Sequence, residues 1–236
     1  MSNRVVAVVP AAGRGARMGG NIPKQFLSLG DIPILAYALR TLESVQSITD
    51  IIVVIPQADQ DYCREDIIER CGIRKVTDIV SGGPRRQDSV RNGLMAITET
   101  PALVVVHDGV RPFVSKKIVT NAVHVAMESG AALVAIPMKD TVKRVNQQGY
   151  VEGTLNREEL WLAQTPQVFR YSWLMEAHQL AEAKNLEVTD DAGMIEQLGY
   201  PISIVEGSAH NIKITRPEDL ALGEAILSCQ KLEGGE

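Results

Sequence analysis

The chain is poor in cysteine, has no excess of positive charge and lacks any long hydrophobic run. Cys63, Cys71 and Cys229 are odd in number and show no C-x-x-C spacing, which argues against a disulfide framework or a zinc site and favours reduced thiols. The 24 Lys and Arg residues against 29 Asp and Glu give a net charge of −5, which argues against a broad nucleic-acid-binding surface. No apolar run approaches the length of a membrane span, and the N-terminus lacks a signal-peptide pattern. We therefore expect a cytoplasmic protein that binds neither nucleic acid nor membrane.

The composition is that of an ordinary globular protein, with 45% hydrophobic and 22% charged residues. Short apolar, β-rich runs recur at 5–9, 51–55, 76–80, 103–107, 132–136 and 202–205. Because these runs are continuous rather than alternating, they predict a mostly parallel sheet with helices on both faces, an α/β fold of the Rossmann-like type. The 236 residues suit a single domain spanning 1–236.

Three helices have recognisable ends. Pro33 opens a stretch whose apolar residues recur at three- and four-residue spacing. Ser115 is a candidate N-cap for a second helix, which Gly130 ends. Thr215-x-x-Glu218 is a capping-box pattern that predicts the start of a final helix near the C-terminus.

Residues 138–158 depart from the alternation of strands and helices. Segments 141–145 and 150–155 flank a polar turn at 146–149, which is typical of a β-hairpin. An isolated hairpin is marginally stable in water, so this arm must pack on its own domain or on a second subunit. We take the second option as the sharper hypothesis, in which a protruding β-hairpin arm forms a homodimer.

The most informative segment is 10–24, a loop of small residues and basic side chains directly after the first apolar run. Gly13 and Gly15 allow the backbone to bend tightly and bring bare N–H groups to an anion, while Arg17 and Lys24 add positive charge. The loop lacks the Gly-Lys-Ser/Thr of a Walker A motif and the third glycine of a dinucleotide fingerprint. It therefore predicts a phosphate-binding loop of another kind, with an ordinary strand-to-helix turn as the alternative.

A second polar segment, His107–Pro112, lies at the end of another apolar run. Ligands of open α/β sheets collect at the carboxyl ends of the strands, so Asp108 is expected opposite the phosphate-binding loop. Mg²⁺ is usually held by one or two carboxylates together with substrate phosphates, which makes Asp108 the candidate metal ligand. The alternative for Asp108 is a turn residue, because Asp-Gly is a common turn pair. His107 is interpreted as a packed strand-end residue and not as a base.

A third segment, Ser81–Ser89, also follows a strand. The backbone at Gly82 and Gly83 is expected to approach a base or ribose, and Ser89 to supply a short hydrogen-bonding side chain. The alternative is that Asp88 or Ser89 caps the helix that follows. Arg86 and the arginine before it are interpreted as solvated surface residues.

Three further residues have competing interpretations. Lys213, expected on a short strand, is able to bring a third positive charge to the site, although a strand lysine is usually a surface residue. Thr189 begins a Thr-Asp-Asp run that suits helix capping as well as substrate binding. Arg157 has acidic neighbours, so an ion pair is the alternative to substrate binding.

Together these segments resemble the 2-C-methyl-D-erythritol 4-phosphate cytidylyltransferase family of the non-mevalonate isoprenoid pathway, over almost the whole chain. The most specific matches are Pro10-Ala-Ala-Gly-x-Gly-x-Arg17-Met18, Pro23-Lys24-Gln25 and His107-Asp108-Gly109-x-Arg111-Pro112. Further matches, in the family's order, are Asp140-Thr141-Val-Lys143, Gln164-Thr165-Pro166-Gln167 and Asn211-Ile-Lys213-Ile-Thr215-x-Pro217-Glu-Asp219-Leu220.

The resemblance implies a nucleotidyltransferase domain that joins CTP and 2-C-methyl-D-erythritol 4-phosphate to give the 4-diphosphocytidyl product and pyrophosphate. The substrate phosphate attacks the α-phosphorus in line, with Mg²⁺ as cofactor on Asp108. The catalytic residues implied are Arg17, Lys24 and Lys213. The nucleotide-binding residues implied are Pro10, Ala11, Ala12, Gly13, Gly15, Gly83, Asp88 and Ser89. The sugar-phosphate-binding residues implied are Arg111, Thr165, Thr189, Lys213 and, from the partner subunit's arm, Thr141 and Arg157.

Two rival functions share parts of this pattern. A ribitol-5-phosphate cytidylyltransferase has the same loop, aspartate and Thr-Pro-Gln segment, but the Pro10-Ala11-Ala12 opening and Asp140-Thr141-Val-Lys143 favour methylerythritol phosphate. A non-catalytic nucleotide-sensing module is possible on the same fold, because fold alone does not determine function. The combination of Arg17, Lys24 and Asp108 argues against such a module, since binding alone does not require charges around a reacting phosphorus.

Overall fold

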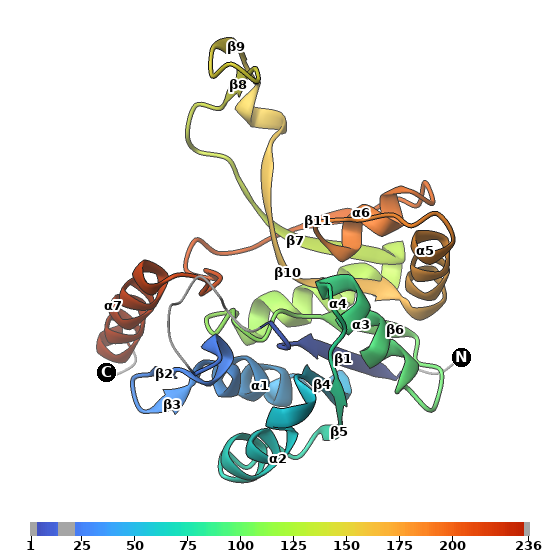
Figure 1. The fold of residues 1–236 in the computed structure, drawn as a ribbon, viewed down its shortest axis with the longest axis vertical. Coiled ribbons are helices and arrows are strands. Elements are labelled where there is room, and N and C mark those ends of the chain that lie inside the picture. Colours follow the sequence, from blue (N-terminus) through green and yellow to red (C-terminus); the bar gives the residue numbers. More distant parts are fainter. Residues whose placement is uncertain (1–3, 14–21, 234–236) are drawn as a thin grey trace.

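The computed structural model describes residues 4–13 and 22–233, and its centre is a seven-stranded sheet in the order β11-β7-β10-β6-β1-β4-β5 (Figure 1). The strands are β1 (Val5–Pro10), β4 (Ile48–Ile55), β5 (Val76–Ser81), β6 (Leu103–Val106), β7 (Ala131–Pro137), β10 (Trp161–Arg170) and β11 (Ser203–Glu206). The pairs are parallel except for those that β10 makes with β6 and β7. The mostly parallel α/β sheet predicted from the sequence is confirmed.

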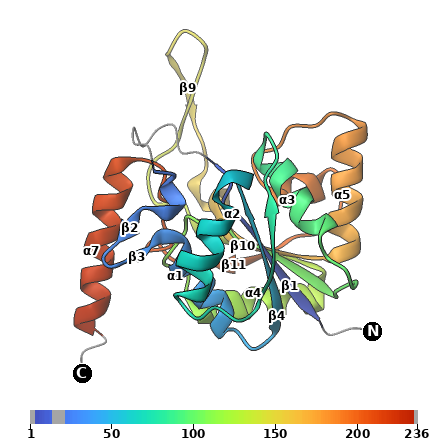
Figure 2. The ribbon, with the colours of Figure 1, turned by 60° about the horizontal axis from the view of Figure 1, so that its bottom comes forward.

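Helices cover both faces of the sheet, which explains why its strands are apolar on both sides (Figure 2). Val9 of β1 joins the core beneath α1 (Ile34–Ser44), η4 (Cys63–Glu69) and α4 (Lys116–Ser129). Val8, which points the other way, joins the core beneath α3 (Arg86–Met95), α5 (Tyr171–Ala183) and α6 (Asp191–Glu196). A polar residue at either position would lie in a dry interior.

The helix ends follow the sequence with one exception. Ser115 caps α4 by accepting a hydrogen bond from the N–H of Ile118, and Gly130 ends it with φ of 93°. The C-terminal helix α7 (Pro217–Glu233) begins where expected, but the N–H of Thr215 donates to Asp219 and not to Glu218. The carboxylate of Asp219 instead accepts hydrogen bonds from the N–H and hydroxyl of Thr215, at 2.8 and 2.9 Å. The capping-box prediction was therefore wrong about the acceptor, which is Asp219 and not Glu218.

The strand β10 is the one strand of the seven-stranded sheet that the sequence did not reveal. It contains Pro166, and a proline argues against a central strand because it cannot donate a ladder hydrogen bond. In the structure the pairing of β10 with β7 is interrupted between Ala163 and Gln167, so Pro166 lies in a bulge where no ladder bond is required.

The arm predicted at 138–158 is confirmed as a hairpin of β8 (Lys143–Val145) and β9 (Val151–Thr154), and it projects away from the sheet (Figures 1 and 2). Gly149 closes its turn with φ of 86°, a conformation that favours glycine. Both strands are exposed along their length, and Tyr150 at the tip is 72% exposed. Dimerisation through this arm stays a prediction.

A small outer layer packs against the loop that follows β6. It contains η2 (Lys24–Phe26), β2 (Ser28–Leu29), β3 (Ile32–Pro33) and α7, which lies alongside β2 (Figure 1). Leu29, Val110, Phe113 and Ile214 form a separate buried cluster there. The short helices η3 (Gln57–Asp59) and α2 (Gln60–Tyr62) precede η4, and η5 (Arg157–Glu159) lies at the end of the arm.

Candidate active site

Three loops that the sequence analysis singled out meet at the carboxyl edge of the sheet. They follow β1, β5 and β6 and enclose a pocket of about 390 Å³, here called the large pocket. Its lining residues are Pro10, Ala11, Ala12, Gly13, Lys24, Gln25, Gly83, Pro84, Arg85, Arg86, Ser89, Asp108, Val110 and Lys213. Parallel strands end at the same edge, so segments far apart in the sequence are brought together there.

The loops after β1 and β5 approach each other closely because of glycine. A Cβ built on Gly82 would collide with the side chain of Ala12, so a larger residue would force the two loops apart. The next residue, Gly83, donates its N–H to the hydroxyl of Ser89 at 3.1 Å. Asp88 does not line the pocket. Its carboxylate accepts hydrogen bonds from the N–H and the guanidinium of Arg85 and caps α3. The alternative considered for Asp88, a helix cap, is the one observed.

A second, small pocket of about 200 Å³ adjoins the first. Its lining residues are Arg86, Asp108, Arg111, Ala163, Gln164, Thr165, Gln167, Thr189, Asp190 and Lys213. Arg86, Asp108 and Lys213 line both pockets and therefore mark the junction between them. A reaction between two bound molecules would take place at this junction.

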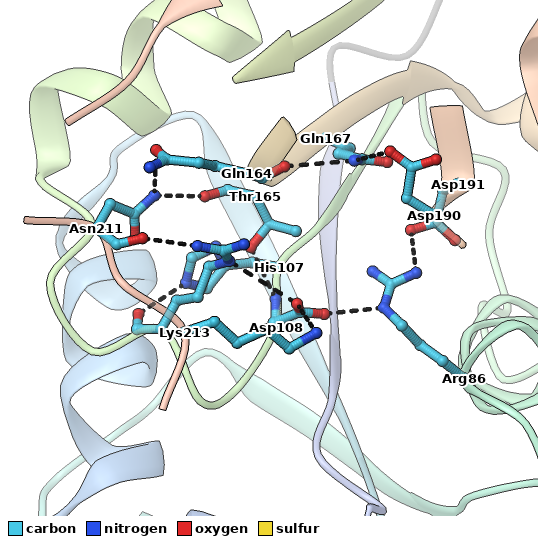
Figure 3. A network of polar contacts seen from close by, with 11 residues as sticks. Arg86, His107, Asp108, Gln164, Thr165, Gln167, Asp190, Asp191, Asn211 and Lys213 are labelled. Carbon is cyan, nitrogen blue, oxygen red and sulfur yellow. Dashed lines mark hydrogen bonds and ion pairs between the residues drawn. The ribbon is translucent and has the colours of Figure 1, made fainter. Parts of the chain in front are cut away.

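Asp108 is the centre of a cluster of positive charges at the junction (Figure 3). Its Oδ1 accepts from Nε of Arg86 at 2.9 Å, and its Oδ2 lies 2.7 Å from Nζ of Lys213 and 3.8 Å from Nε of Arg111. Burial of the carboxyl opposes its ionisation, but the three cations outweigh burial and hold the pKa of Asp108 well below its usual range. Asp108 is therefore an ionised, acceptor-only group with 4% of its surface exposed.

Asp108 is oriented by a chain of hydrogen bonds in which each group donates to the next. Its backbone N–H donates to Oγ1 of Thr165 at 3.1 Å, and that hydroxyl lies 2.9 Å from Nδ1 of His107. Nε2 of His107 lies 3.2 Å from the carbonyl of Arg111. A carbonyl only accepts, so we assign the imidazole proton to Nε2, and Nδ1 then accepts from Thr165. His107 is fully buried, and burial lowers its pKa to about 4.

Because His107 stays neutral in the folded protein, stability is expected to depend on pH. The unfolded imidazole gains a proton as the pH falls below about 6.5, whereas the folded one resists until about 4. We expect His107 to contribute a loss of up to about 3 kcal/mol in the free energy of unfolding across that window. Urea unfolding of the wild type and His107→Asn at pH 7.5 and 4.5 measures this contribution as a difference.

The matched control is His124→Asn, at an exposed position on α4. It should retain the wild-type pH dependence of unfolding, whereas His107→Asn should have a shallower one. Equal slopes for wild type and His107→Asn would contradict the assignment.

Lys213 reaches the junction from an irregular segment between β11 and α7, not from the short strand that was expected. Asn211, fully buried, anchors this segment: its side-chain amide donates to the carbonyl of Thr165 at 2.8 Å and to Oε1 of Gln164 at 3.1 Å (Figure 3). The backbone carbonyl of Asn211 accepts a hydrogen bond from Nη1 of Arg111 at 2.7 Å. The Gln-Thr-Pro-Gln and Asn-Ile-Lys motifs are thus joined by direct hydrogen bonds.

These observations coincide with a family relationship over nearly the whole chain. Residues 5–229 match the family model described as 2-C-methyl-D-erythritol 4-phosphate cytidylyltransferase. The chain belongs to this family. The curated 2-C-methyl-D-erythritol 4-phosphate cytidylyltransferase of Pelotomaculum thermopropionicum is 48% identical over 97% of this chain and 96% of its own. That of Geotalea uraniireducens is 49% identical over 95% and 97%.

Solved structures agree with the sequence relatives. The 4-diphosphocytidyl-2C-methyl-D-erythritol synthase of Anaerococcus prevotii superposes with a TM-score of 0.85 at 32% identity, covering 95% of this chain and 96% of its own. The 2-C-methyl-D-erythritol 4-phosphate cytidylyltransferase of Thermus thermophilus gives a TM-score of 0.77 at 35% identity, covering 97% and 100%. The cytidylyltransferase fold predicted from the resemblance is confirmed.

The cytidylyltransferase structure brings together most of the residues singled out from the sequence. Those lining the large pocket are Pro10, Ala11, Ala12, Gly13, Lys24, Gly83, Ser89, Asp108 and Lys213. Those lining the small pocket are Arg111, Thr165, Thr189, Asp108 and Lys213. Thr141 and Arg157 lie on the arm and line neither pocket, while Gly15 and Arg17 lie outside the described residues. The roles assigned to all of them stay predictions.

Arg86 is the site residue that sequence reasoning missed. The interpretation of Arg86 as a solvated surface residue was wrong, because its side chain is 25% exposed and pairs with both Asp108 and Asp191. Asp191 itself is fully buried. The signal that was available is the position of Arg86 at the start of a helix that directly follows a strand end.

No cluster of three or more His, Cys, Asp or Glu residues suited to a metal ion occurs within 4–13 and 22–233. In the same ranges, no helix has the length and hydrophobicity that a membrane span requires.

Proposed function

We propose that this chain transfers a cytidylyl group from CTP to 2-C-methyl-D-erythritol 4-phosphate, releasing pyrophosphate. The observation that carries the proposal is the junction itself, where Asp108, Arg86 and Lys213 line two adjoining pockets at once. A transferase for two phosphorylated substrates requires two sites that meet at the reacting phosphorus. The names of the relatives supply the identity of the two substrates.

CTP is assigned to the large pocket, with its phosphates toward the backbone of Ala11–Gly13 and toward Lys24. The sugar phosphate is assigned to the small pocket, with Arg111, Thr165 and Thr189 around it. One phosphate oxygen of the sugar phosphate forms a bond to the α-phosphorus of CTP, while the bond from that phosphorus to the bridging oxygen breaks and pyrophosphate leaves. A phosphate monoester is already ionised at neutral pH, so the attack needs no protein base.

The protein's contribution is then positioning and neutralisation of charge. We assign to Lys213 at the junction and Lys24 in the large pocket the task of neutralising the negative charge that develops on the transferred group. Arg17, which lies outside the described residues, is proposed for the same task because it belongs to the same loop. His107 and Asn211 act behind the site by orienting Asp108 and Lys213.

Asp108 is proposed to hold Mg²⁺. One ionised carboxylate lies at the pocket junction, and Mg²⁺ is commonly held by one or two carboxylates together with substrate phosphates. Asp108 would therefore supply one ligand, and the substrate phosphates would complete the site. A carboxylate offers about four lone-pair sites, so contacts to Arg86 and Lys213 do not exhaust it. When bound, the metal ion supplies charge neutralisation at the phosphates of CTP.

We further propose that residues 1–236 form a single nucleotidyltransferase domain that works as a homodimer through the arm. Apolar side chains exposed on the arm and at its base support an intersubunit role; they are Val145, Tyr150, Val151, Trp161 and Leu162. Thr141 and Arg157 are assigned to the partner subunit's small pocket.

A cytoplasmic location is proposed because the three thiols of Cys63, Cys71 and Cys229 are free, which suits a reducing compartment.

The test is a two-substrate assay in which pyrophosphate release is followed with CTP, Mg²⁺ and either 2-C-methyl-D-erythritol 4-phosphate or ribitol 5-phosphate. We expect release that needs both CTP and the sugar phosphate, with methylerythritol phosphate the faster substrate. Faster turnover of ribitol 5-phosphate would overturn the choice of sugar. Binding of CTP without turnover of either would overturn the enzyme assignment.

A further inference from the structure

Arg86 bridges two carboxylates that come from different parts of the fold. Its Nε donates to Oδ1 of Asp108 at 2.9 Å, and its Nη1 forms an ion pair with Oδ2 of Asp191 at 2.7 Å (Figure 3). Asp191 is the first residue of α6, has no exposed surface, and lines neither pocket. Its route to the reaction site is therefore through Arg86.

The neighbouring Arg85, the N-cap residue of α3, shows how an arginine pairs with a single carboxylate. Its Nε and Nη2 donate to the two oxygens of Asp88 at 2.9 Å each, which is the bidentate arrangement that arginine and carboxylate prefer. Arg86 presents Nε to Asp108 but contacts only one oxygen. Its Nη2 is buried and has no hydrogen-bond partner among the described residues.

The ion pair with Asp191 is a second restraint on the guanidinium of Arg86. Nε and Nη1 contact carboxylates on different elements, so the attraction of Nη1 to Asp191 helps to set the plane in which Nε donates to Oδ1 of Asp108. As a result Oδ2 of Asp108 keeps its contact with Lys213 and stays at the pocket junction. A bidentate Arg86 would also occupy one lone pair of Oδ2 and leave a single one for Lys213 and Mg²⁺ together.

We propose that Asp191 is a positioning residue that restrains Arg86 to a single contact with Asp108 and thereby leaves Oδ2 to Lys213 and to Mg²⁺. The inference rests on the proposed function, since it assigns a supporting residue to the same reaction. It adds a buried carboxylate on α6 that touches neither substrate pocket.

The first variant is Asp191→Asn, which preserves shape and removes the charge. We expect kcat to fall roughly tenfold, and the Mg²⁺ concentration for half-maximal rate to rise by a similar factor, as is typical when a residue that orients a metal ligand is lost. Calorimetric titration with CTP gives a readout independent of turnover. The affinity should fall in the presence of Mg²⁺ and stay unchanged in EDTA.

A double-mutant cycle with Arg86→Lys tests the route of the effect. Lysine keeps the charge but cannot bridge two carboxylates with a planar fork. If Asp191 acts through Arg86, adding Asp191→Asn to Arg86→Lys causes no further loss of kcat. A loss that multiplies in the double variant overturns the proposal. If Asp191→Asn does not fold, Arg86→Lys must by itself raise the Mg²⁺ requirement, and a wild-type requirement overturns the proposal.

The matched control is Asp50→Asn, which breaks the ion pair with Arg4 far from the site. It should lower the free energy of unfolding and leave the Mg²⁺ dependence unchanged. An Asp191→Asn protein with the same behaviour would have only a structural defect, which overturns the proposal. An inactive wild type in the two-substrate assay would instead refute the proposed function.

Discussion

Asp108→Asn is expected to lower kcat for pyrophosphate release by roughly 10²–10³, as is typical for loss of one preorganised charge at a reacting centre. The carboxylate lies at the junction of both pockets and is the proposed ligand of Mg²⁺. Asparagine keeps the shape and one oxygen but removes the negative charge that Arg86, Lys213 and Arg111 surround. Steady-state kinetics with saturating CTP and methylerythritol phosphate measure the loss.

The same substitution should also reduce stability, because it leaves cations at the junction without their shared partner. Removing one member of a buried pair typically costs about 3–5 kcal/mol, an upper bound here because Arg86 and Lys213 are partly exposed. Unfolding in urea must therefore accompany the kinetics, so that activity is compared only where both proteins are fully folded. A folded Asp108→Asn enzyme within a few-fold of wild-type kcat would refute the role of Asp108.

Mixing two inactive variants is expected to restore activity if the arm completes the partner subunit's site. Arg157→Ala removes the proposed arm contact, and Asp108→Asn disables the junction, so each homodimer alone should lose most of its activity. In a mixed dimer, the intact arm of the Asp108→Asn protomer reaches the intact junction of the Arg157→Ala protomer. Random exchange should recover roughly a quarter of wild-type activity, because half of the dimers then carry one functional site of two.

The geometry of the single chain supports this test. Arg157 is exposed in η5, and its Nη1 donates to the carbonyl of Lys139 at 2.8 Å rather than lining either pocket. The control is a mixture of Asp108→Asn with Lys213→Ala, two changes at the same junction, which cannot complement each other in one site. Recovery in that control, or none with Arg157→Ala, would contradict an arm that acts between subunits.

The fold was largely predictable because its strands carry their environment in their sequence. β1, β6 and residues 51–55 of β4 are buried on both faces, so each is a continuous run of apolar residues that does not occur in the loops. The strand β10 was not predictable in this way. Its Pro166 is tolerated only because the ladder with β7 is interrupted at that point, and such an interruption depends on the neighbouring strand.

The residues of the candidate site also fall into those that the sequence indicated and those that it did not. Gly13, Lys24, Asp108 and Gly83 could be selected from the sequence because each follows a strand end, and parallel strands end at one edge. Arg86 was not selected, because its position after a strand end places it only near the sheet edge and an arginine in the first turn of a helix is ordinarily solvated. Its importance arises from Asp108, twenty-two residues away, and from Asp191 on a different helix.

The sequence by itself therefore determined six of the seven strands of the main sheet, the hairpin arm, the three loops and the family, because local hydrophobicity, glycine and short motifs are properties of neighbouring residues. The tertiary structure alone decided which oxygen of Asp108 each cation takes, which tautomer His107 adopts and where Arg86 and β10 lie. Those features depend on charges and hydrogen-bonding groups that approach each other only after the chain has folded, and no local pattern encodes their distances.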